Sequence, residues 1–557
     1  MKYFLIALGI IIFFMIQYRI ELKNKEKRLR RKIRAEWGTF AERRFTSEEL
    51  YMISSYHRHQ AYGFTVDDIT WHDTSMDEVF IALNRTYSSV GEEYLYHVLR
   101  TPSFSEKELK ERSRVADIFS ENEKTRENVA FLLSCIGKNY KIPFTEYVVR
   151  LMEMKPQGNL FHICILLMIL VSVYITLTMP SLGIILLVGT LVFSIVTYYQ
   201  KKSEVEPYFI CIQKILLLAE SAKKISALDI PELKELRDEL KKLSGMVHQK
   251  THFIWLMQTG SSMGGSIFDL VLDYLRMATH IDLIVFNRIF HDLKAREKEI
   301  FRLIELAGQL ELGLVTASLR EKLVNWCEPE LSGTRPRLSS ENMVHPLISE
   351  PVANTIHTEN HVLLTGSNAS GKSTFLKTAA INSLLAQTLY TVAATSWHSP
   401  WFRVYSSMAL ADNLFEGESY FIVEIKSLKR IMDSMTADDC PVLCFVDEVL
   451  RGTNTVERIA ASAQILRNFV GKGALCFAAT HDIELTTLLS PYYDNYHFTE
   501  EVRENDVYFP YLLKDGPARS RNAIRLLGVM GYDEGLTKKA EETAKRFLET
   551  GTWSLEG

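Results

Sequence analysis

The residues best suited to chemistry lie in one glycine-containing segment, residues 366–373, which read Gly-Ser-Asn-Ala-Ser-Gly-Lys-Ser. This order matches the phosphate-binding loop G-x-x-x-x-G-K-[ST] in full. The glycines let backbone N–H groups close around a β-phosphate, Lys372 supplies a cation for the β- and γ-phosphates, and the Ser373 hydroxyl can ligate Mg²⁺. We therefore predict a nucleotide site. Its predicted nucleotide-binding residues are Gly366, Ser367, Asn368, Ala369, Ser370, Gly371, Lys372, Ser373 and Thr374.

Two carboxylates and a histidine follow apolar runs further along the chain. Asp447 and Glu448 come directly after residues 442–446, and His481 follows residues 474–479. Asp447 can hold Mg²⁺ through water, and Glu448 can orient or deprotonate the water that attacks a γ-phosphate. An acidic pair at the start of a helix is the common alternative, and the phosphate loop upstream disfavours it. His481 can contact the γ-phosphate and sense its hydrolysis.

These residues need a sheet that brings the ends of several strands together. The apolar runs 361–365, 442–446 and 474–479 have the length of buried strands, and helical sequence, including a helix from Thr374 onward, separates each run from the next. That alternation is typical of a parallel α/β domain. Residues 328–346 are rich in Pro, Ser, Gly and Arg, which indicates a domain boundary. The sequence therefore predicts a C-terminal α/β P-loop domain.

The sequence upstream of this boundary is helical. Residues 35–157 and 204–327 carry apolar side chains at helical intervals, and Leu233, Leu236, Leu240 and Leu243 repeat on one face of a charged helix. The run from Leu283 to Leu323 alternates apolar and charged positions, as long lever or coiled-coil helices do. We expect an all-α core and lever domain in front of the α/β domain.

Two stretches lack charged residues and predict membrane spans. Residues 3–18 are uncharged, and residues 19–34 then carry nine Lys or Arg against two Glu. Residues 161–199 contain no Asp, Glu, Lys or Arg, and Pro180 and Gly183 break them into two helices. By the positive-inside rule the following chain is cytoplasmic, so we predict three spans in the cell membrane. A signal peptide or an interfacial helix is the alternative for residues 3–18, and a buried soluble hairpin is the alternative for residues 161–199.

The amino-acid composition excludes several other classes of protein. Hydrophobic residues make up 47% of the 557 residues, which excludes a disordered chain. The formal net charge is −4, so a uniformly basic nucleic-acid-coating protein is excluded, although a local basic patch is not. The seven cysteines form no Cys-x-x-Cys pair, which favours reduced thiols in a cytosolic compartment over disulfides or structural zinc.

Taken together, the motifs resemble the MutS family, the DNA mismatch-repair ATPases of the ABC-type class. The resemblance rests on residues 365–374, on Ser-Tyr-Phe-Ile-Val-Glu at 419–424, on Asp-Glu-Val-Leu-Arg-Gly-Thr-Asn-Thr at 447–455 and on Ala-Thr-His at 479–481. It continues upstream through His345-Pro346 and, more loosely, through helical residues 80–112. The resemblance therefore covers the predicted α/β domain best.

This resemblance implies an ATPase that converts ATP and water to ADP and phosphate, with Glu448, His481 and Ser419 as catalytic residues and Ser373 and Asp447 as ligands of Mg²⁺. Ser419 is similar to the family's signature serine, which reaches the γ-phosphate bound by the opposite subunit. Asn454 falls in the loop that crosses the dimer interface. The resemblance therefore also implies a homodimer with composite ATP sites, and double-stranded DNA as a partner.

The sequence departs from the family in three places. Only some 60 residues precede the region similar to the core domain, so we expect the mismatch-reading and connector domains to be absent. The only match to the family's Phe-x-Glu wedge that we note begins at Phe40, and we interpret Phe40 as a packing residue. Residues 515–522 replace the family's Ser-Tyr-Gly pattern, and Tyr511 is a candidate for stacking on adenine.

Two alternatives stay open: an ABC-type membrane transporter, or a membrane scaffold that uses the ATPase as a switch without DNA. This sequence lacks the Leu-Ser-Gly-Gly-Gln signature of such a transporter.

Residues 260–264 fit the G-x-S-x-G nucleophile pattern, but no strand precedes them, and a helix break explains them better. The predicted domains are 1–19 (membrane anchor), 20–64 (basic juxtamembrane helix), 65–157 (first part of the core domain), 158–200 (membrane hairpin), 201–328 (lever and second part of the core) and 329–557 (ATPase).

Overall fold

The computed structural model divides into two compact units, each discontinuous in sequence. Unit 1 comprises residues 1–61, 83–97 and 114–321, and unit 2 comprises residues 62–82, 98–113 and 322–557. This division differs from the contiguous ranges predicted above, because residues 62–82 and 98–113 group with the α/β part of the chain. The structure describes residues 2–60, 63–156, 158–247, 267–367, 369–408, 420–435, 440–450, 453–503, 506–518, 524, 527 and 530–554.

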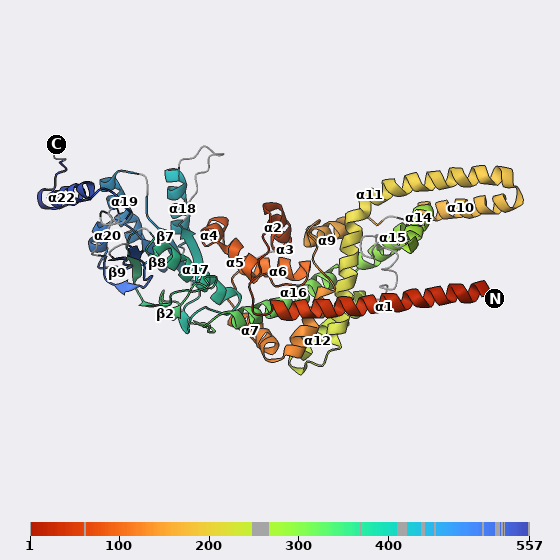
Figure 1. The fold of residues 1–557 in the computed structure, drawn as a ribbon, viewed down its shortest axis with the longest axis horizontal. Coiled ribbons are helices and arrows are strands. Elements are labelled where there is room, and N and C mark those ends of the chain that lie inside the picture. Colours follow the sequence, from red (N-terminus) through yellow and green to blue (C-terminus); the bar gives the residue numbers. More distant parts are fainter. Residues whose placement is uncertain are drawn as a thin grey trace. The chain divides into compact units, whose positions relative to one another are not determined.

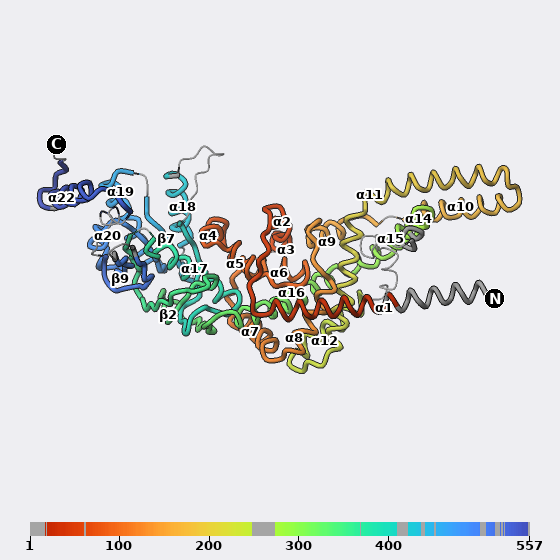
Figure 2. The backbone as a smooth tube through the Cα atoms, viewed as in Figure 1, coloured from red at the N-terminus to blue at the C-terminus, as the bar shows by residue number. Residues whose placement is uncertain are grey.

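Unit 1 is helical, as the apolar periodicity predicts, and its helices can be followed in Figures 1 and 2. They are α1 (Lys2–Glu36), α2 (Ser47–Ile53), α3 (Ser55–Arg58), α8 (Glu123–Ser134), α9 (Phe144–Glu153), α10 (Leu160–Thr178), α11 (Pro180–Ser226), the 3₁₀ turn η1 (Pro231–Leu233), α12 (Lys234–Val247), α14 (Ile267–Thr279), α15 (Ile281–Lys294) and α16 (Glu297–Lys322). The last residue of α16, Lys322, already belongs to unit 2, and three further helices contain residues of both units: α5 (Met76–Leu83), α6 (Ser89–Arg100) and α7 (Glu106–Glu121).

The predicted single run from Leu283 to Leu323 is wrong in one respect. The chain turns between α15 and α16, where the N–H of Arg296 donates to the carbonyl of Leu293 at 2.8 Å. A hydrogen bond over three residues closes a turn, whereas an α-helix bonds over four. The apolar spacing continues through this turn, which is why the sequence pattern does not reveal it.

A buried carboxylate fixes α16 to the start of α6. Glu311 is fully buried and accepts hydrogen bonds from the N–H groups of Tyr87 at 2.5 Å and Ser88 at 3.2 Å. A Cβ atom on Gly91 would lie 2.2 Å from the Glu311 carboxyl carbon, so only glycine admits this approach. Burial raises the pKa of Glu311 to about 7, and the hydrogen bonds from Ser88 and Tyr87 oppose this rise.

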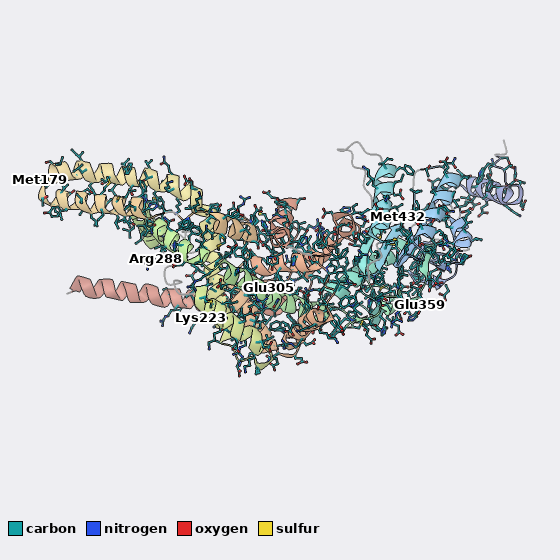
Figure 3. The ribbon with its side chains drawn as sticks, turned by 180° about the vertical axis from the view of Figure 1, so that it is seen from behind. Met179, Lys223, Arg288, Glu305, Glu359 and Met432 are labelled. Carbon is teal, nitrogen blue, oxygen red and sulfur yellow. The ribbon has the colours of Figure 1, made fainter. Side chains whose placement is uncertain are left out.

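The predicted apolar hairpin forms two antiparallel helices, α10 and α11, which run side by side in Figures 1 and 2. The break falls at Met179, with Pro180 in the first turn of α11, as predicted. A Cβ atom on Gly183 would lie 2.2 Å from the Cα of Thr176, so glycine allows the two helices to touch next to the turn. Figure 3 labels Met179 at this turn.

Within the described residues, α10 and α11 are the two helices long and apolar enough to cross a membrane. Only 17% of the apolar window of each is buried inside the protein, whereas the core helix of a soluble protein is mostly buried. The backbone of residues 3–18 is part of α1, and the side chains of 2–16 lie outside the described residues. Helix α11 continues past Tyr199 to Ser226, so the second hairpin helix is longer than the apolar run.

Unit 2 contains a six-stranded sheet in the order β12-β9-β4-β8-β7-β6. Its strands are β4 (His361–Thr365), β6 (Arg403–Ser407), β7 (Val442–Asp447), β8 (Ala474–Ala479), β9 (Tyr493–His497) and β12 (Lys514–Asp515). Neighbouring strands are parallel except for β12, which pairs antiparallel with β9. The helices of this unit are α4 (Asp68–Asp73), α17 (Lys372–Thr388), α18 (Tyr420–Ser434), α19 (Thr455–Asn468), α20 (Ile483–Leu488) and α22 (Glu534–Thr550).

The predicted boundary segment 328–346 holds strands rather than a plain linker. Strands β1 (Glu330–Leu331) and β2 (Leu338–Met343) join β3 (Asn354–Thr358) and β5 (Ser396–Ser399) in a four-stranded sheet with the order β1-β5-β2-β3. These strands are short and polar, and partners distant in sequence supply their hydrogen bonds. Their composition alone is therefore that of a loop. A separate hairpin is formed by β10 (Glu501–Arg503) and β11 (Asp506–Tyr508).

Strand register brings the candidate site together. Leu364 and Asp447 both pair with Ala479, so the ends of β4, β7 and β8 lie level. The phosphate loop, the acidic pair and Thr480-His481 follow these three strands directly. In open α/β sheets, ligands bind at the carboxyl ends of the strands.

Candidate nucleotide-binding site

Two glycines of the loop after β4 adopt backbone conformations that favour glycine over other residues. Gly366 has φ +147° and Gly371 has φ +111°. A Cβ atom on Gly366 would lie 2.7 Å from the carbonyl oxygen of Phe498, so a side chain there would displace backbone. The Ser370 hydroxyl donates to the Ser367 carbonyl at 2.8 Å and closes the loop. The result is the cradle that a phosphate requires.

Lys372 extends its ammonium group into this cradle. Its side chain is 5% exposed, and Nζ donates to the carbonyls of Gly366 at 2.8 Å and Ser367 at 2.9 Å. Lys372 is also the first residue of α17, whose N-terminus carries partial positive charge. The charged side chain and the helix end together make this an anion site.

Ser373 and Asp447 form the site that suits Mg²⁺. The Ser373 hydroxyl donates to Oδ2 of Asp447 at 2.5 Å, which joins the start of α17 to the end of β7. Asp447 is 8% exposed, so its charge is largely screened from solvent. Hydroxyl and carboxylate oxygens are the hard donors that Mg²⁺ prefers, and these two are adjacent. The donor set therefore fits the predicted metal.

Glu448 and His481 form a second polar pair beside the loop. The Nε2 atom of His481 lies 2.8 Å from Oε1 of Glu448. Glu448 has φ +57°, a conformation that side-chain-bearing residues rarely adopt, and its N–H donates to the Ala479 carbonyl at 2.9 Å. This unusual backbone turns the carboxylate toward the cavity beside the phosphate loop, which Glu448 lines.

A cavity of about 440 Å³ opens beside the loop, a size typical of small-molecule sites. Tyr511 lines it and lies against Gly371, where an added Cβ would be 3.1 Å from the ring. Asn354 holds Tyr511 in place, since its amide donates to the Tyr511 carbonyl at 3.1 Å and accepts from the Leu513 N–H at 2.7 Å. The cavity therefore places an aromatic ring next to the phosphate cradle.

His345 also lines the cavity. Burial, aided by the nearby Lys377 ammonium, lowers the pKa of His345 to about 4, so the ring is neutral at pH 7. Its Nδ1 accepts the N–H of Leu347 at 3.2 Å, which fixes the ring. His345 therefore presents a neutral polar surface to a ligand.

Comparison with known proteins agrees with this geometry. Residues 362–548 match the family model described as MutS domain V. The C-terminal part of the chain therefore carries a domain of the MutS type. Three curated proteins, each named DNA mismatch repair protein MutS, are similar to it: that of Pseudothermotoga lettingae (29% identical over 271 residues), that of Thermus aquaticus (28% over 264) and that of Thermotoga sp. strain RQ2 (28% over 278).

The similarity to these relatives is partial. The matches cover 46–48% of this chain and 32–34% of each relative. The chain therefore spans about a third of the length of the curated MutS proteins it matches. What is shared is the ATP-binding domain, and the sequence motifs that predicted it all fall in or next to residues 362–548.

Most of the predicted site residues of the MutS domain V come together. Asn368 and Ser419 lie outside the described residues. Asn454 caps α19, where its side chain accepts the N–H of Val456 at 3.0 Å. Gly366, Ser367, Ala369, Ser370, Gly371, Lys372, Ser373, Thr374, Asp447, Glu448 and His481 surround the carboxyl ends of β4, β7 and β8.

Helix α18 is tied to the loop after β7. Glu424, on α18, is 3% exposed and accepts the N–H of Leu450, two residues beyond Glu448. A buried carboxylate that accepts a backbone N–H fixes the position of both elements. The structure therefore joins α18 to the loop after β7.

Sequence reasoning missed several residues that shape the site. Phe498 and Glu500 come from the loop after β9, and Asn354 is the first residue of β3. Glu500 accepts the Ser367 hydroxyl at 2.7 Å. Arg458 on α19 pairs with both carboxylate oxygens of Asp482, at 2.9 and 2.5 Å, and fixes the residue after His481. No spacing rule connects these positions, because they meet only after the sheet has formed.

Proposed function

We propose that this MutS-family protein hydrolyses ATP to ADP and phosphate with Mg²⁺, as a membrane-anchored homodimer that binds double-stranded DNA. The observation that carries the catalytic part is the convergence of Lys372, Ser373, Asp447, Glu448 and His481 at one edge of the sheet. Each of these side chains has a separate task in phosphoryl transfer.

Each of these residues has a separate role in the proposed reaction. Lys372 and the loop N–H groups bind the β- and γ-phosphates and orient the terminal one. Ser373 and Asp447 hold Mg²⁺, which when bound neutralises charge on the phosphates. Glu448 orients the attacking water and accepts its proton, while His481 fixes the Glu448 carboxylate through the 2.8 Å contact. The ring of Tyr511 stacks on adenine.

The experiment that tests this activity is phosphate release from ATP by the purified full-length chain. We expect release with Mg²⁺ and none after chelation by EDTA, with recovery when Mg²⁺ is restored. Equal release with and without Mg²⁺ would contradict the role given to Ser373 and Asp447.

The homodimer follows from the family resemblance. Ser419 precedes Asp447 by 28 residues and belongs to a different segment from the phosphate loop. A two-fold dimer would bring Ser419 of each chain to the γ-phosphate of the other, so two equal ATP sites would form from one repeated surface. Asn454, at the start of α19, would lie in the same interface.

Membrane anchoring is supported by the exposure of α10 and α11. Their large apolar side chains face outward, for example Leu170 at 56% and Ile185 at 71% exposure. Lys201 and Lys202 follow the apolar run, and the basic stretch of α1 follows residues 3–18. We propose three spans in the cell membrane, with the ATPase domain in the cytoplasm.

DNA is the proposed macromolecular partner, because the three relatives are named DNA mismatch repair proteins. The test is a salt titration of the affinity of the detergent-solubilised protein for homoduplex, mismatched and branched DNA, with and without ATP. Phosphate contacts predict that the logarithm of the affinity falls linearly with the logarithm of salt concentration. Absence of DNA binding at low salt would favour the transporter, which ATP-dependent flux in liposomes would reveal, or the scaffold.

A further inference from the structure

The corner between α14 and α15 has an inverted distribution of polar and apolar side chains. Across residues 273–282, the exposed side chains are Tyr274 at 62%, Leu275 at 53% and Ile281 at 37%. The buried ones are Arg276 at 6%, His280 at 0% and Asp282 at 2%. In water, charged side chains face solvent and large apolar ones face the core. This corner has the opposite arrangement, which fits an apolar surrounding.

The buried ionisable groups of the corner have partners within the protein, although the side chain of Asp273 is 36% exposed. Arg276 pairs with Asp273 at 2.7 Å, on the same face of α14. The Nδ1 atom of His280 lies 2.9 Å from Nδ1 of His162 on α10, and Oδ2 of Asp282 accepts the Tyr198 hydroxyl at 2.8 Å. Such inward pairing removes the cost of placing polar groups in a medium without water.

The backbone of the corner is satisfied in the same way. His280 adopts a left-handed conformation, φ +53°, between the two helices. The Ser194 hydroxyl, on α11, donates to the Ala278 carbonyl at 2.7 Å and lies 3.1 Å from that of Met277. The ring Nε2 of His280 donates to the Ser194 carbonyl at 2.9 Å. Non-helical backbone at membrane depth occurs only where protein groups complete its hydrogen bonds, as here.

The corner lies against the apolar hairpin. Helices α14 and α15 both pack on α10 and α11, and Ser194 lies inside the uncharged run that ends at Tyr199. The first exposed cation along α15 is Arg288, labelled in Figure 3. It lies seven residues, or about 10 Å of helix, beyond Ile281. The exposed apolar surface of the hairpin therefore continues onto the corner.

We propose that the α14–α15 corner is a fourth membrane-embedded element, which enters the bilayer from the cytoplasmic side and returns, with Tyr274, Leu275 and Ile281 in contact with lipid. Lys202 marks the boundary, since its ammonium donates to the Tyr198 hydroxyl at 2.6 Å and lies 3.7 Å from Asp282. This inference rests on the proposed anchoring of α10 and α11.

The test uses nitroxide labels on the full-length protein in liposomes. Cys135 and Cys164, the two exposed cysteines of the described residues, are first replaced by alanine. Single cysteines are then introduced at Leu275 and Ile281, at Leu170 of the hairpin as the lipid control, and at Lys241 of α12 as the water control. Relaxation by oxygen, which concentrates in hydrocarbon, is compared with relaxation by a water-soluble nickel chelate.

We expect labels at Leu275→Cys and Ile281→Cys to behave like Leu170→Cys, with at least twofold greater response to oxygen than to nickel, and Lys241→Cys to show the reverse. If the corner labels follow Lys241 while Leu170 stays in lipid, the corner lies in water and the inference is wrong. Shielding from both reagents would indicate a protein partner and overturns it equally. If Leu170 also follows Lys241, the anchoring itself fails.

A second measurement avoids substitution. The unaltered protein is irradiated in liposomes of phosphatidylcholine with a diazirine in the acyl chain, and adducts are mapped by mass spectrometry. Adducts are expected on Tyr274 or Leu275 as well as on α10 and α11. Adducts on α10 and α11 alone would contradict the inference.

Discussion

At the scale of single residues, the site works through pairs of side chains from different elements. Ser373 contacts Asp447 and so joins the start of α17 to the end of β7, and His481 contacts Glu448 and so joins the segments that follow β8 and β7. Lys372 differs, because its ammonium donates to two carbonyls of the phosphate loop itself and not to another element. Its substitution is therefore the simplest test of nucleotide binding.

Lys372→Ala should reduce ATP affinity by at least tenfold, because the phosphates lose their nearest fixed cation. The measurement is equilibrium binding of a fluorescent ATP analogue. Lys429→Ala on the exposed face of α18 is the matched control, since Lys429 pairs with Asp433 away from the cavity. Equal affinity in the two variants would show that Lys372 does not bind phosphate.

At the scale of elements, the sequence predicts those helices and strands whose own residues carry the pattern, and it misses those that depend on partners distant in sequence. Strands β4 and β8 were predicted residue for residue, because each is an uninterrupted apolar run buried on both faces. Strands β1 and β2 were missed, since their polar residues are paired by β5 and β3 from further along the chain. The break of the hairpin at Met179 was found because Pro180 makes it a local signal.

The same distinction holds for the site. The phosphate loop, Asp447, Glu448 and His481 were found because each follows a strand that composition reveals. The contacts of Asn354 with the backbone of Tyr511 and Leu513, and of Glu500 with Ser367, link residues more than 130 positions apart. Only the folded sheet brings them together, so no pattern along one sequence could show them.

The central strands carry an acid-sensitive residue. His361 on β4 is 6% exposed, and its Nδ1 accepts the Cys476 N–H of β8 at 3.0 Å. Burial lowers the pKa of His361 to about 4. Between pH 6.5 and 4 the unfolded chain binds a proton here and the folded chain does not, so the free energy of unfolding falls as pH falls, by up to roughly 3 kcal/mol.

His361→Asn should therefore flatten the decrease of the melting temperature of the ATPase domain between pH 6.5 and 4. Differential scanning fluorimetry across this window measures it. His357→Asn, on an exposed histidine of β3, should leave the slope as in the parent protein. An unchanged slope in His361→Asn would mean that this ring does not govern acid sensitivity.

At the scale of the whole molecule, one chain carries both a region that matches MutS domain V and an apolar helical hairpin. A chain lacking residues 1–19 should still sediment with membranes, because α10 and α11 remain. The measurement is fractionation before and after detergent, with a carbonate wash to remove peripheral proteins. Recovery of the truncated chain in the soluble fraction without detergent would refute the hairpin as an anchor.

The proposed dimer gives a second prediction at this scale. Ser419→Arg and Lys372→Ala chains should each be inactive, because each spoils both sites of its homodimer. A co-purified heterodimer should regain up to about half of the parent ATPase activity, since one of its two sites combines an intact Lys372 with an intact Ser419. Activity no greater than that of either variant alone would argue against composite sites.

The central claim is that the site at the carboxyl edge of the sheet hydrolyses ATP, with binding and turnover assigned to different residues. The most direct measurement is ATP binding and phosphate release by Glu448→Gln in liposomes, beside Glu359→Gln, an exposed residue outside the cavity. We predict that Glu448→Gln binds ATP as the parent does and releases phosphate about 100-fold more slowly, because only the attacking water loses its partner. Phosphate release at the parent rate would contradict the account.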